Sequence, residues 1–409
     1  MVILALAVAL VGVGVAVIVR SLGTGTPGGG EPARGGSRHR PAADMGGPLT
    51  ITVGGTYRGA WRSDNPRVPA VLVATPDPIR IVDSELAGAG ALITTGVPHA
   101  KIDVENSRGI ALYPGGRGIA PGRFLDAEGF DSVTVEGNEL RGTSGIRLLD
   151  WAGGPGRNDA VRILRNRALE IDGRLTDGTG GFSRSRWEPA QFVQLDKVIG
   201  APAMEIAWNE VTNTPGRGRV EDNISVYLSS GTRQAPLLIH DNYIQGGYPG
   251  GPRDDYGGGG IMLGDGGSDA RGTRAPAWVR AFDNQVVGTT NYGLAIAAGH
   301  DLVMYGNRAV ASGLLPDGTR LAATNVGLYI ANLYRVPGFT GNAAYGNTVA
   351  WYRPGGGMRN DWWLPGCAQP RCDNMALSPG GTVSLRDEAA ERVRWERKVI
   401  SAGIHVGPV

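Results

Sequence analysis

Eight short apolar segments of the chain each end in asparagine, and this internal repeat sets the strongest limit on the fold. The eight asparagines follow one another at intervals of 32, 28, 43, 33, 42, 23 and 40 residues. Repeats of roughly 20–50 residues indicate a solenoid or another repeat array. The segments are KIDVEN (101–106), VTVEGN (133–138), VRILRN (161–166), MEIAWN (204–209), LLIHDN (237–242), VRAFDN (279–284), LVMYGN (302–307) and AAYGN (343–347).

A second series of apolar segments alternates with the first. Its aliphatic residues stand at every second position, as in Ile224, Val226 and Leu228, which is the period of a β-strand. No helix-forming stretch of about 10–15 residues separates the strands, so βαβ units are excluded. Two or three strands per interval are too few for propeller blades. The segments are RFLDA (123–127), GIRLLD (145–150), FVQLDK (192–197), ISVYLSS (224–230), GIMLGD (260–265), GLAIAA (293–298) and GLYIAN (327–332).

These two series predict an all-β fold, a right-handed parallel β-helix over residues 49–380, in which each turn of the chain adds one rung. Glycine and proline make up 93 of the 409 residues, which suits a chain with many turns. Asparagine tolerates left-handed backbone, and its amide bonds neighbouring main chain. We therefore expect the eight asparagines to stack along the axis as a hydrogen-bonded ladder, which is a structural role.

The two ends of the chain differ from this body. Residues 1–19 carry no charge and are long enough to cross a bilayer, so we expect 1–20 to be a transmembrane signal anchor or a signal peptide. Residues 21–48 have the composition of a flexible Gly/Pro/Arg linker. Residues 384–402 carry acids early and bases late, which predicts a helix, and we expect 381–409 to cap the last rungs.

Cysteine usage and net charge restrict the compartment and the partners. Cys367 and Cys372 form either a small loop-closing disulfide or half a metal site, and no second Cys/His cluster completes a zinc site. The disulfide is favoured, and it fits an oxidising compartment outside the cytoplasm. Residues 49–409 carry equal numbers of acidic and basic side chains. No global field therefore attracts nucleic acid, and we expect no nucleic-acid partner.

The phrases ITVGGTYRG, PAVLVAT and PIRIVDSEL, followed by rungs that end in V-x-V-x-x-N, resemble the pectate-lyase-like right-handed β-helix superfamily. The resemblance covers roughly 49–380. It is specific for the fold and not for the activity, because that superfamily includes polysaccharide lyases, glycoside hydrolases, uronan epimerases and non-catalytic adhesins.

Four aspartates of the second series stand at or just past strand ends, and we expect Asp126, Asp150 and Asp196 to form a column on the outer face, with Asp265 further along. Strands lie ~4.8 Å apart, so such carboxyls span the ~5–9.5 Å separations of glycosidase pairs. Stacked carboxylates repel one another, which raises the pKa of one of the aspartates. A bound cation such as calcium would neutralise them instead. The alternative is that these aspartates accept hydrogen bonds from glycine-rich turns.

Two basic residues lie beside these aspartates. Lyases of the superfamily use a lysine or arginine base next to a uronate carboxylate, so the resemblance implies Lys197 as a candidate base and Arg123 as a partner for substrate charge. A simple Asp–Lys pair at the strand end is the alternative for Lys197. Strand parity places Lys197 on the core side unless the strand has already ended.

The longest insertions, 171–189 and 246–260, carry arginine and aromatic residues that suit carboxylates and sugar faces. From them we expect substrate contacts by Arg174, Trp187, Tyr248, Arg253 and Tyr256. The sequence thus predicts a monomeric, membrane-tethered or secreted protein that acts on a polysaccharide by lyase or hydrolase chemistry. The alternative is a non-catalytic surface protein that binds polysaccharide or serves as a spacer.

Overall fold

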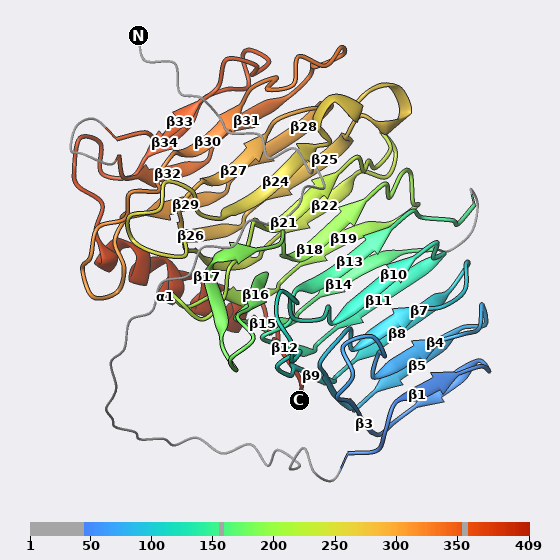
Figure 1. Cartoon of the computed structure of the whole chain (residues 1–409). Helices are drawn as coiled ribbons and strands as arrows, with labels where there is room; N and C mark the ends of the chain where they lie inside the picture. Colours follow the sequence, from blue (N-terminus) through green and yellow to red (C-terminus); the bar gives the residue numbers. More distant parts are fainter. Residues whose placement is uncertain (1–44, 155–158, 354–358) are drawn as a thin grey trace. The chain divides into compact units, whose positions relative to one another are not determined.

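The computed structural model describes residues 45–154, 159–353 and 359–409. Within them, three parallel sheets of eleven, ten and eleven strands stand beside one small antiparallel hairpin. Consecutive strands of the chain join the three sheets in rotation, so three strands make one rung (Figure 1). This is the arrangement of a parallel β-helix. The predicted signal anchor 1–20 and residues 21–44 of the predicted linker lie outside the described residues.

Both predicted strand series are confirmed, and each forms its own sheet. Sheet I, built from the second series, consists of β1 (Leu49–Ile51), β4 (Val71–Val73), β7 (Ile93–Thr95), β10 (Leu125–Glu128), β13 (Gly145–Leu149), β18 (Gln191–Asp196), β21 (Asp222–Tyr227), β24 (Gly259–Asp265), β27 (Tyr292–Ile296), β30 (Val326–Ile330) and β33 (Trp362–Trp363). Sheet II, built from the asparagine series, consists of β2 (Gly55–Tyr57), β5 (Ile79–Val82), β8 (Lys101–Glu105), β11 (Ser132–Glu136), β14 (Val161–Leu164), β19 (Met204–Ala207), β22 (Leu237–His240), β25 (Ala277–Phe282), β28 (His300–Tyr305) and β31 (Ala343–Tyr345).

A third sheet follows the asparagine corner and was not predicted as a series. Sheet III consists of β3 (Ala60–Ser63), β6 (Glu85–Gly88), β9 (Arg108–Ala111), β12 (Glu139–Arg141), β15 (Arg167–Leu169), β20 (Glu210–Thr212), β23 (Tyr243–Gly247), β26 (Gln285–Thr289), β29 (Arg308–Ala311), β32 (Thr348–Trp351) and β34 (Met375–Ala376). Between β15 and β18 the chain forms the hairpin β16 (Arg174–Thr176) and β17 (Phe182–Trp187). The short 3-10 helices η2 (Gly267–Asp269) and η3 (Gly272–Arg274) follow β24.

Aliphatic columns fill the interior because parallel pairing repeats the alternation of each strand in the next rung. Leu148 pairs with Leu195, and Leu195 pairs with Val226. All three side chains are fully buried. One continuous apolar cluster extends in this way from Ile51 to Trp351. Residues at intervening positions of the strands consequently face outward, where a site can form.

The asparagine ladder is present. The Oδ1 atom of Asn242 accepts hydrogen bonds from the backbone N–H (3.0 Å) and the side-chain Nδ2 (2.9 Å) of Asn209. Asn242 in turn donates through Nδ2 to Asn284 Oδ1 (2.9 Å) and to the carbonyl oxygen of Ile206 (2.8 Å). The same contacts join the asparagines in sequence from Asn138 to Asn347, at positions 138, 166, 209, 242, 284, 307 and 347.

The structure corrects two details of that prediction. Asn106 is not part of the ladder, because Ser107 occupies the equivalent position and donates its backbone N–H to Asn138 Oδ1 (2.9 Å). The left-handed backbone belongs to the residue before the ladder asparagine, such as Trp208 with φ 58° or Asp241 with φ 54°. Asparagine therefore occupies the corner for its amide and not for its backbone. Asn106 itself, with φ 49°, is the exception.

The predicted helix is present as α1 (Leu385–Ser401), which begins with a capping box between Ser384 and Asp387. It does not lie over the last rungs as predicted. It packs on the outer face of sheet III, where Glu391, almost fully buried, pairs with Arg308 of β29 at 2.7 Å and accepts a hydrogen bond from Gln285 of β26 at 3.1 Å. Arg308 and Gln285, which pair with the buried Glu391 carboxylate, lie on the side of the solenoid, and their contacts hold the helix there.

Cys367 and Cys372 form a disulfide between β33 and β34, which settles the two alternatives for this pair. Thiols oxidise and stay oxidised mainly outside the reducing cytosol, so the bond indicates an oxidising, extracytoplasmic environment. In the described ranges, no helix has the length and apolar character needed to cross a bilayer.

We predict that Asn242→Ala lowers the free energy of unfolding by on the order of 3 kcal/mol, because each buried backbone group left without a partner costs ~1–3 kcal/mol. The substitution removes the partner of the Asn209 N–H and of the Ile206 carbonyl. Urea unfolding followed by circular dichroism measures the change. Asn65→Ala is the matched control: Asn65 is exposed, and its side chain accepts a local hydrogen bond from the Arg67 N–H. Equal effects of the two substitutions would contradict a structural ladder.

Candidate functional site

The predicted column of aspartates does not form. In the register of sheet I, Asp126 pairs with Arg147, whereas Asp196 pairs with Leu149. Asp150 follows the last residue of β13 and adopts left-handed backbone, with φ 52°. The Leu-Asp motif recurs in these segments, but it stands near the beginning of β10 and at the end of β18. The three carboxylates therefore occupy three different columns.

Asp126 is held by an arginine. Arg147 donates from Nε to Asp126 Oδ1 (2.7 Å) and from a terminal nitrogen to Oδ2 (3.0 Å), a bidentate pair on the outer face of sheet I. This hydrogen bonding raises the pKa of Arg147, and burial opposes the effect. The countercharge of Asp126 is thus supplied by the neighbouring rung.

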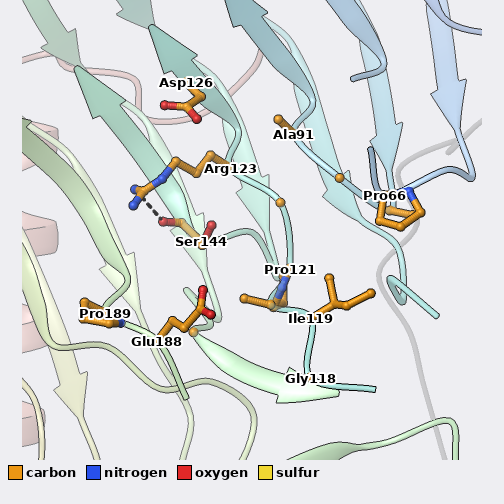
Figure 2. A pocket seen from close by; sticks show the side chains of 15 residues that line it. Pro66, Ala91, Gly118, Ile119, Pro121, Arg123, Asp126, Ser144, Glu188 and Pro189 are labelled. Atoms are coloured by element: carbon orange, nitrogen blue, oxygen red, sulfur yellow. Dashed lines mark hydrogen bonds between the residues drawn. The ribbon is translucent and has the colours of Figure 1, made fainter. Parts of the chain in front are cut away.

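Arg123 lines a pocket of about 390 Å³ next to this pair (Figure 2). Its guanidinium donates to Gln194 Oε1 (3.2 Å) and to the Ser144 carbonyl oxygen (3.4 Å). Burial lowers the pKa of Arg123 to about 10, against the opposing effect of Asp126. Glu188 lines the same pocket from the segment before β18. The pocket therefore holds an arginine between two acidic residues.

Asp150, Asp196 and Lys197 meet at the far end of β13 and β18. Lys197 Nζ lies 3.9 Å from an oxygen of Asp150 and 3.9 Å from an oxygen of Asp196. The strand has ended at Lys197, which has φ 54°, so the side chain does not enter the core. Burial raises the pKa of Asp196, Lys197 opposes the rise, and repulsion from Asp150 adds to it. The geometry is that of an ion-paired strand end.

The two long insertions meet above sheet I. Trp187, at the end of the β16–β17 hairpin, stacks on Tyr256 with ring centroids 6.0 Å apart and planes 23° apart. The Arg219 guanidinium covers the Trp187 ring at 4.5 Å. Two of the three predicted aromatic residues, Trp187 and Tyr256, thus lie in one assembly beside the sheet.

The other predicted loop residues are placed differently. Arg174 pairs with buried Asp172 at 2.8 Å and lies over the Phe182 ring, so it stabilises its own hairpin. Tyr248 is buried, and its pKa is raised by that burial and by nearby Glu388 of α1. Arg253 is exposed in the second insertion. Of these three, only Arg253 remains open to solvent.

The structure also reveals a cluster that the sequence did not predict. Glu221 and Asp265 raise the pKa of Asp222, Asp265 also raises that of Glu221, and tyrosines surround the three carboxyl groups. We call this the acid–tyrosine cluster: Glu221, Asp222, Asp265, Tyr256, Tyr292, Tyr329 and Tyr334. Its members come from β21, β24, β27 and β30, from the residue before β21, and from the loops that follow β23 and β30. Asp265 ended a predicted strand, but Glu221 and Asp222 stand just before one, and no motif marked them.

Asp222 is the centre of the cluster. The Tyr292 hydroxyl donates to Asp222 Oδ1 across two rungs. The rung between them carries Gly259, where a Cβ atom would lie 2.4 Å from the Tyr292 ring and 2.8 Å from Asp222 Oδ1. Any side chain at Gly259 would therefore break this contact. Glycine is required here for close approach, not for a special backbone angle.

The cluster favours a neutral carboxylic acid. Asp222 is only 5% exposed, and burial raises its pKa well above the ordinary value. Repulsion from Glu221 and Asp265 adds to the rise, and the Tyr292 hydrogen bond opposes it. Burial and Asp265 also raise the pKa of Glu221. Glu221 and Asp265 are only half-buried, so the cluster reaches solvent through them.

One hydrogen bond links the cluster to the Arg123 side of the sheet. Gln191, at the start of β18, donates from Nε2 to Glu221 Oε2 at 2.9 Å. Gln191 follows Glu188 and Pro189, which line the Arg123 pocket. From β10 to β21 the sheet advances three strands, or ~14 Å at ~4.8 Å per strand. The pocket and the cluster therefore lie along one line of sheet I.

Calcium was expected at Asp126, Asp150 and Asp196. Across the described ranges, no group of three or more His, Cys, Asp or Glu side chains is arranged to hold a metal ion. Arg147 and Lys197 supply the positive charge next to these aspartates instead.

No protein-family model matches the chain, and no curated protein matches it at a significant level.

We predict that Asp222→Asn flattens the pH dependence of stability. The folded state raises the pKa of Asp222, so it binds more protons than the unfolded chain, and wild-type stability falls as pH rises above the ordinary aspartate pKa of ~3.9. The fall amounts to about 1.4 kcal/mol per pH unit until the raised pKa is reached. Urea unfolding from pH 4 to pH 8 measures it, with exposed Asp77→Asn as control. Parallel curves for wild type and Asp222→Asn would refute the buried acid.

Proposed function

We propose that this protein is an extracytoplasmic, right-handed β-helix of the pectate-lyase-like kind that hydrolyses a polysaccharide lying along the outer face of sheet I. The rotation of the chain through three long parallel sheets supports the fold assignment. The disulfide supports the compartment. The uncharged segment 1–19 is the proposed export signal or anchor.

A single observation carries the proposal of hydrolysis. Asp222 is a buried carboxyl whose pKa is raised beside two further carboxyls, Glu221 and Asp265. Glycoside hydrolysis needs one carboxylic acid that keeps its proton and one carboxylate that acts as nucleophile or base. We assign Asp222 the proton and assign the second role to Glu221 or Asp265, which are half-buried.

The surroundings suit a sugar chain. Tyr256, which is exposed and stacks on Trp187, provides an aromatic ring of the kind that binds the apolar side of a sugar ring. The Arg123 pocket lies further along the same sheet and provides a guanidinium for a hydroxyl or carboxylate. A chain bound along the axis would contact both.

Lyase chemistry has less support. Lys197, the candidate base, is engaged by Asp150 and Asp196 at the strand end. Arg123, the other basic candidate, donates to Gln194 and Ser144. Neither side chain is placed beside the acid–tyrosine cluster. Hydrolysis therefore accounts for more of the geometry than β-elimination does.

We predict that Asp222→Asn, Glu221→Gln and Asp265→Asn each lower glycan hydrolysis, Asp222→Asn by ~10²–10⁴-fold, which is the usual contribution of a general acid. Released reducing ends are measured on uronic-acid and neutral polysaccharides, with and without calcium. Asp196→Asn and Lys197→Ala serve as controls on the same sheet and are expected to keep most of the activity.

Three results would overturn the proposal. Full activity of Asp222→Asn would remove the general acid. Products with a new double bond, detected by their ultraviolet absorbance, would replace hydrolysis with elimination. Polysaccharide binding without any product, unchanged in all variants, would support the alternative of a non-catalytic binding protein.

A further inference from the structure

A second pocket, of about 250 Å³, lies on sheet II, a different face of the β-helix from the acid–tyrosine cluster. Three strands, β25, β28 and β31, which lie side by side in Figure 1, carry six of the eight lining residues. Aromatic and basic side chains dominate it. The lining residues are Trp278, Arg280, Asp301, Val303, Tyr305, Gly341, Tyr345 and Arg371.

One wall of this pocket is a stack of aromatic rings. Phe282 and Tyr305 stack with centroids 5.1 Å apart, and Tyr305 and Tyr345 with centroids 5.5 Å apart, each pair with planes within 9°. The parallel register causes the stack, because these residues occupy the same position in successive strands. Arg371 continues it, with its guanidinium 5.0 Å from the Tyr345 centroid. The stack thus holds a positive charge at one end of the pocket.

The opposite wall is formed by Trp278 of β25, whose indole lines the pocket. Its backbone is left-handed, with φ 56°, as it is at Trp208 and Asp241. The His300 and Trp278 rings meet edge to face at a centroid distance of 6.2 Å. His300 therefore supports the indole at the wall of the pocket.

The floor and the charges complete the pocket. Val303 pairs in register with Arg280, so an apolar surface lies beside a second guanidinium. The single acid of the lining, Asp301, is 2.8 Å from His300 Nδ1. Two arginines and one aspartate give the lining a net positive charge. Guanidinium groups bind carboxylate and sulfate groups through paired hydrogen bonds, while Val303 and the edges of the stacked rings offer an apolar surface to the carbon atoms of a sugar.

We propose that this pocket is a second glycan-binding site, which holds an acidic sugar residue of a polysaccharide between Arg280 and Arg371. The sugar ring lies against Val303 and the aromatic walls, and its acidic group accepts hydrogen bonds from a guanidinium. Binding at this site requires no catalysis. The proposal is therefore independent of whether the acid–tyrosine cluster hydrolyses glycans. Polymer held on sheet II would raise the local concentration of substrate near sheet I.

Binding of short oligosaccharides by isothermal titration calorimetry tests the proposal. The probes are a uronic-acid oligomer, a sulfated neutral oligomer and the same neutral oligomer without sulfate. The Asp222→Asn protein is used throughout so that no probe is cleaved. We expect the wild-type sheet II pocket to bind one or both acidic probes, to bind the neutral probe at least ~10-fold more weakly, and to lose affinity as salt rises. Preference between the two acidic probes identifies the acidic group.

Three substitutions assign the binding to this pocket. Arg280→Ala and Arg371→Ala are each expected to weaken acidic-probe binding by ~10-fold or more, since each removes charge-assisted hydrogen bonds to the acidic group. Arg162→Ala is the matched control. Arg162 is an exposed arginine of β14 that shares the outward column of Arg280 through Glu205 and Leu238. Circular dichroism confirms that each variant is folded.

Several outcomes would overturn the site. Absence of binding of either acidic probe, equal affinity for the neutral probe, or an equal loss in Arg162→Ala would each do so. Loss of acidic-probe binding in Arg123→Ala with full binding in Arg280→Ala would place the sugar on sheet I instead. The binding test does not depend on the hydrolase proposal, because it measures probe binding by the folded Asp222→Asn protein and not hydrolysis.

Discussion

The hydrogen-bonded stacking of one asparagine on the next holds the register of the rungs from Asn138 to Asn347. Each ladder amide bonds the backbone of the rungs beside it, so neighbouring rungs cannot slip without leaving buried polar groups unpaired. The aliphatic columns of the core, the aromatic stack of sheet II and the pairs on sheet I all depend on this register. A single repeated side-chain contact therefore determines which distant residues become neighbours.

The acid–tyrosine cluster illustrates that dependence. Asp222 and Tyr292 are 70 residues apart in the chain, and they meet only because both lie on sheet I with Gly259 between them. Burial then determines the protonation of Asp222, because a carboxyl removed from water beside Glu221 and Asp265 favours its protonated form. The stacking of the rungs therefore produces both the repeated fold and the raised pKa of Asp222.

The sequence predicted the parts of the fold whose pattern is long enough to recognise. Strands of sheets I and II reach six or seven residues, whereas the described strands of sheet III have at most five, and several, such as Arg167–Leu169, have three and start directly after the corner. The aspartate column failed for a different reason. A Leu-Asp pair marks neither the start nor the end of a strand, so its position in the register depends on where pairing begins.

The site was harder to predict than the fold because its parts carry no local pattern. Trp187 and Tyr256 were found because arginine and aromatic residues crowd two long insertions. Asp222 lies before a predicted strand, Tyr292 is one aromatic residue in an apolar segment, and Gly259 belongs to a run of four glycines. These residues become neighbours only because three particular rungs pair with one another. Such pairing is a long-range property, which propensities of single segments do not contain.

The β16–β17 hairpin has a consequence for how such a protein can change. It is inserted between β15 and β18, yet β13 pairs with β18, and Asn166 bonds Asn209 across a gap of 43 residues, as if the insertion were absent. The solenoid accepts extra chain between rungs without altering its interior. Loops that border sheet I can accordingly be exchanged, lengthened or removed in evolution or by design, so that specificity is modular while the scaffold stays constant.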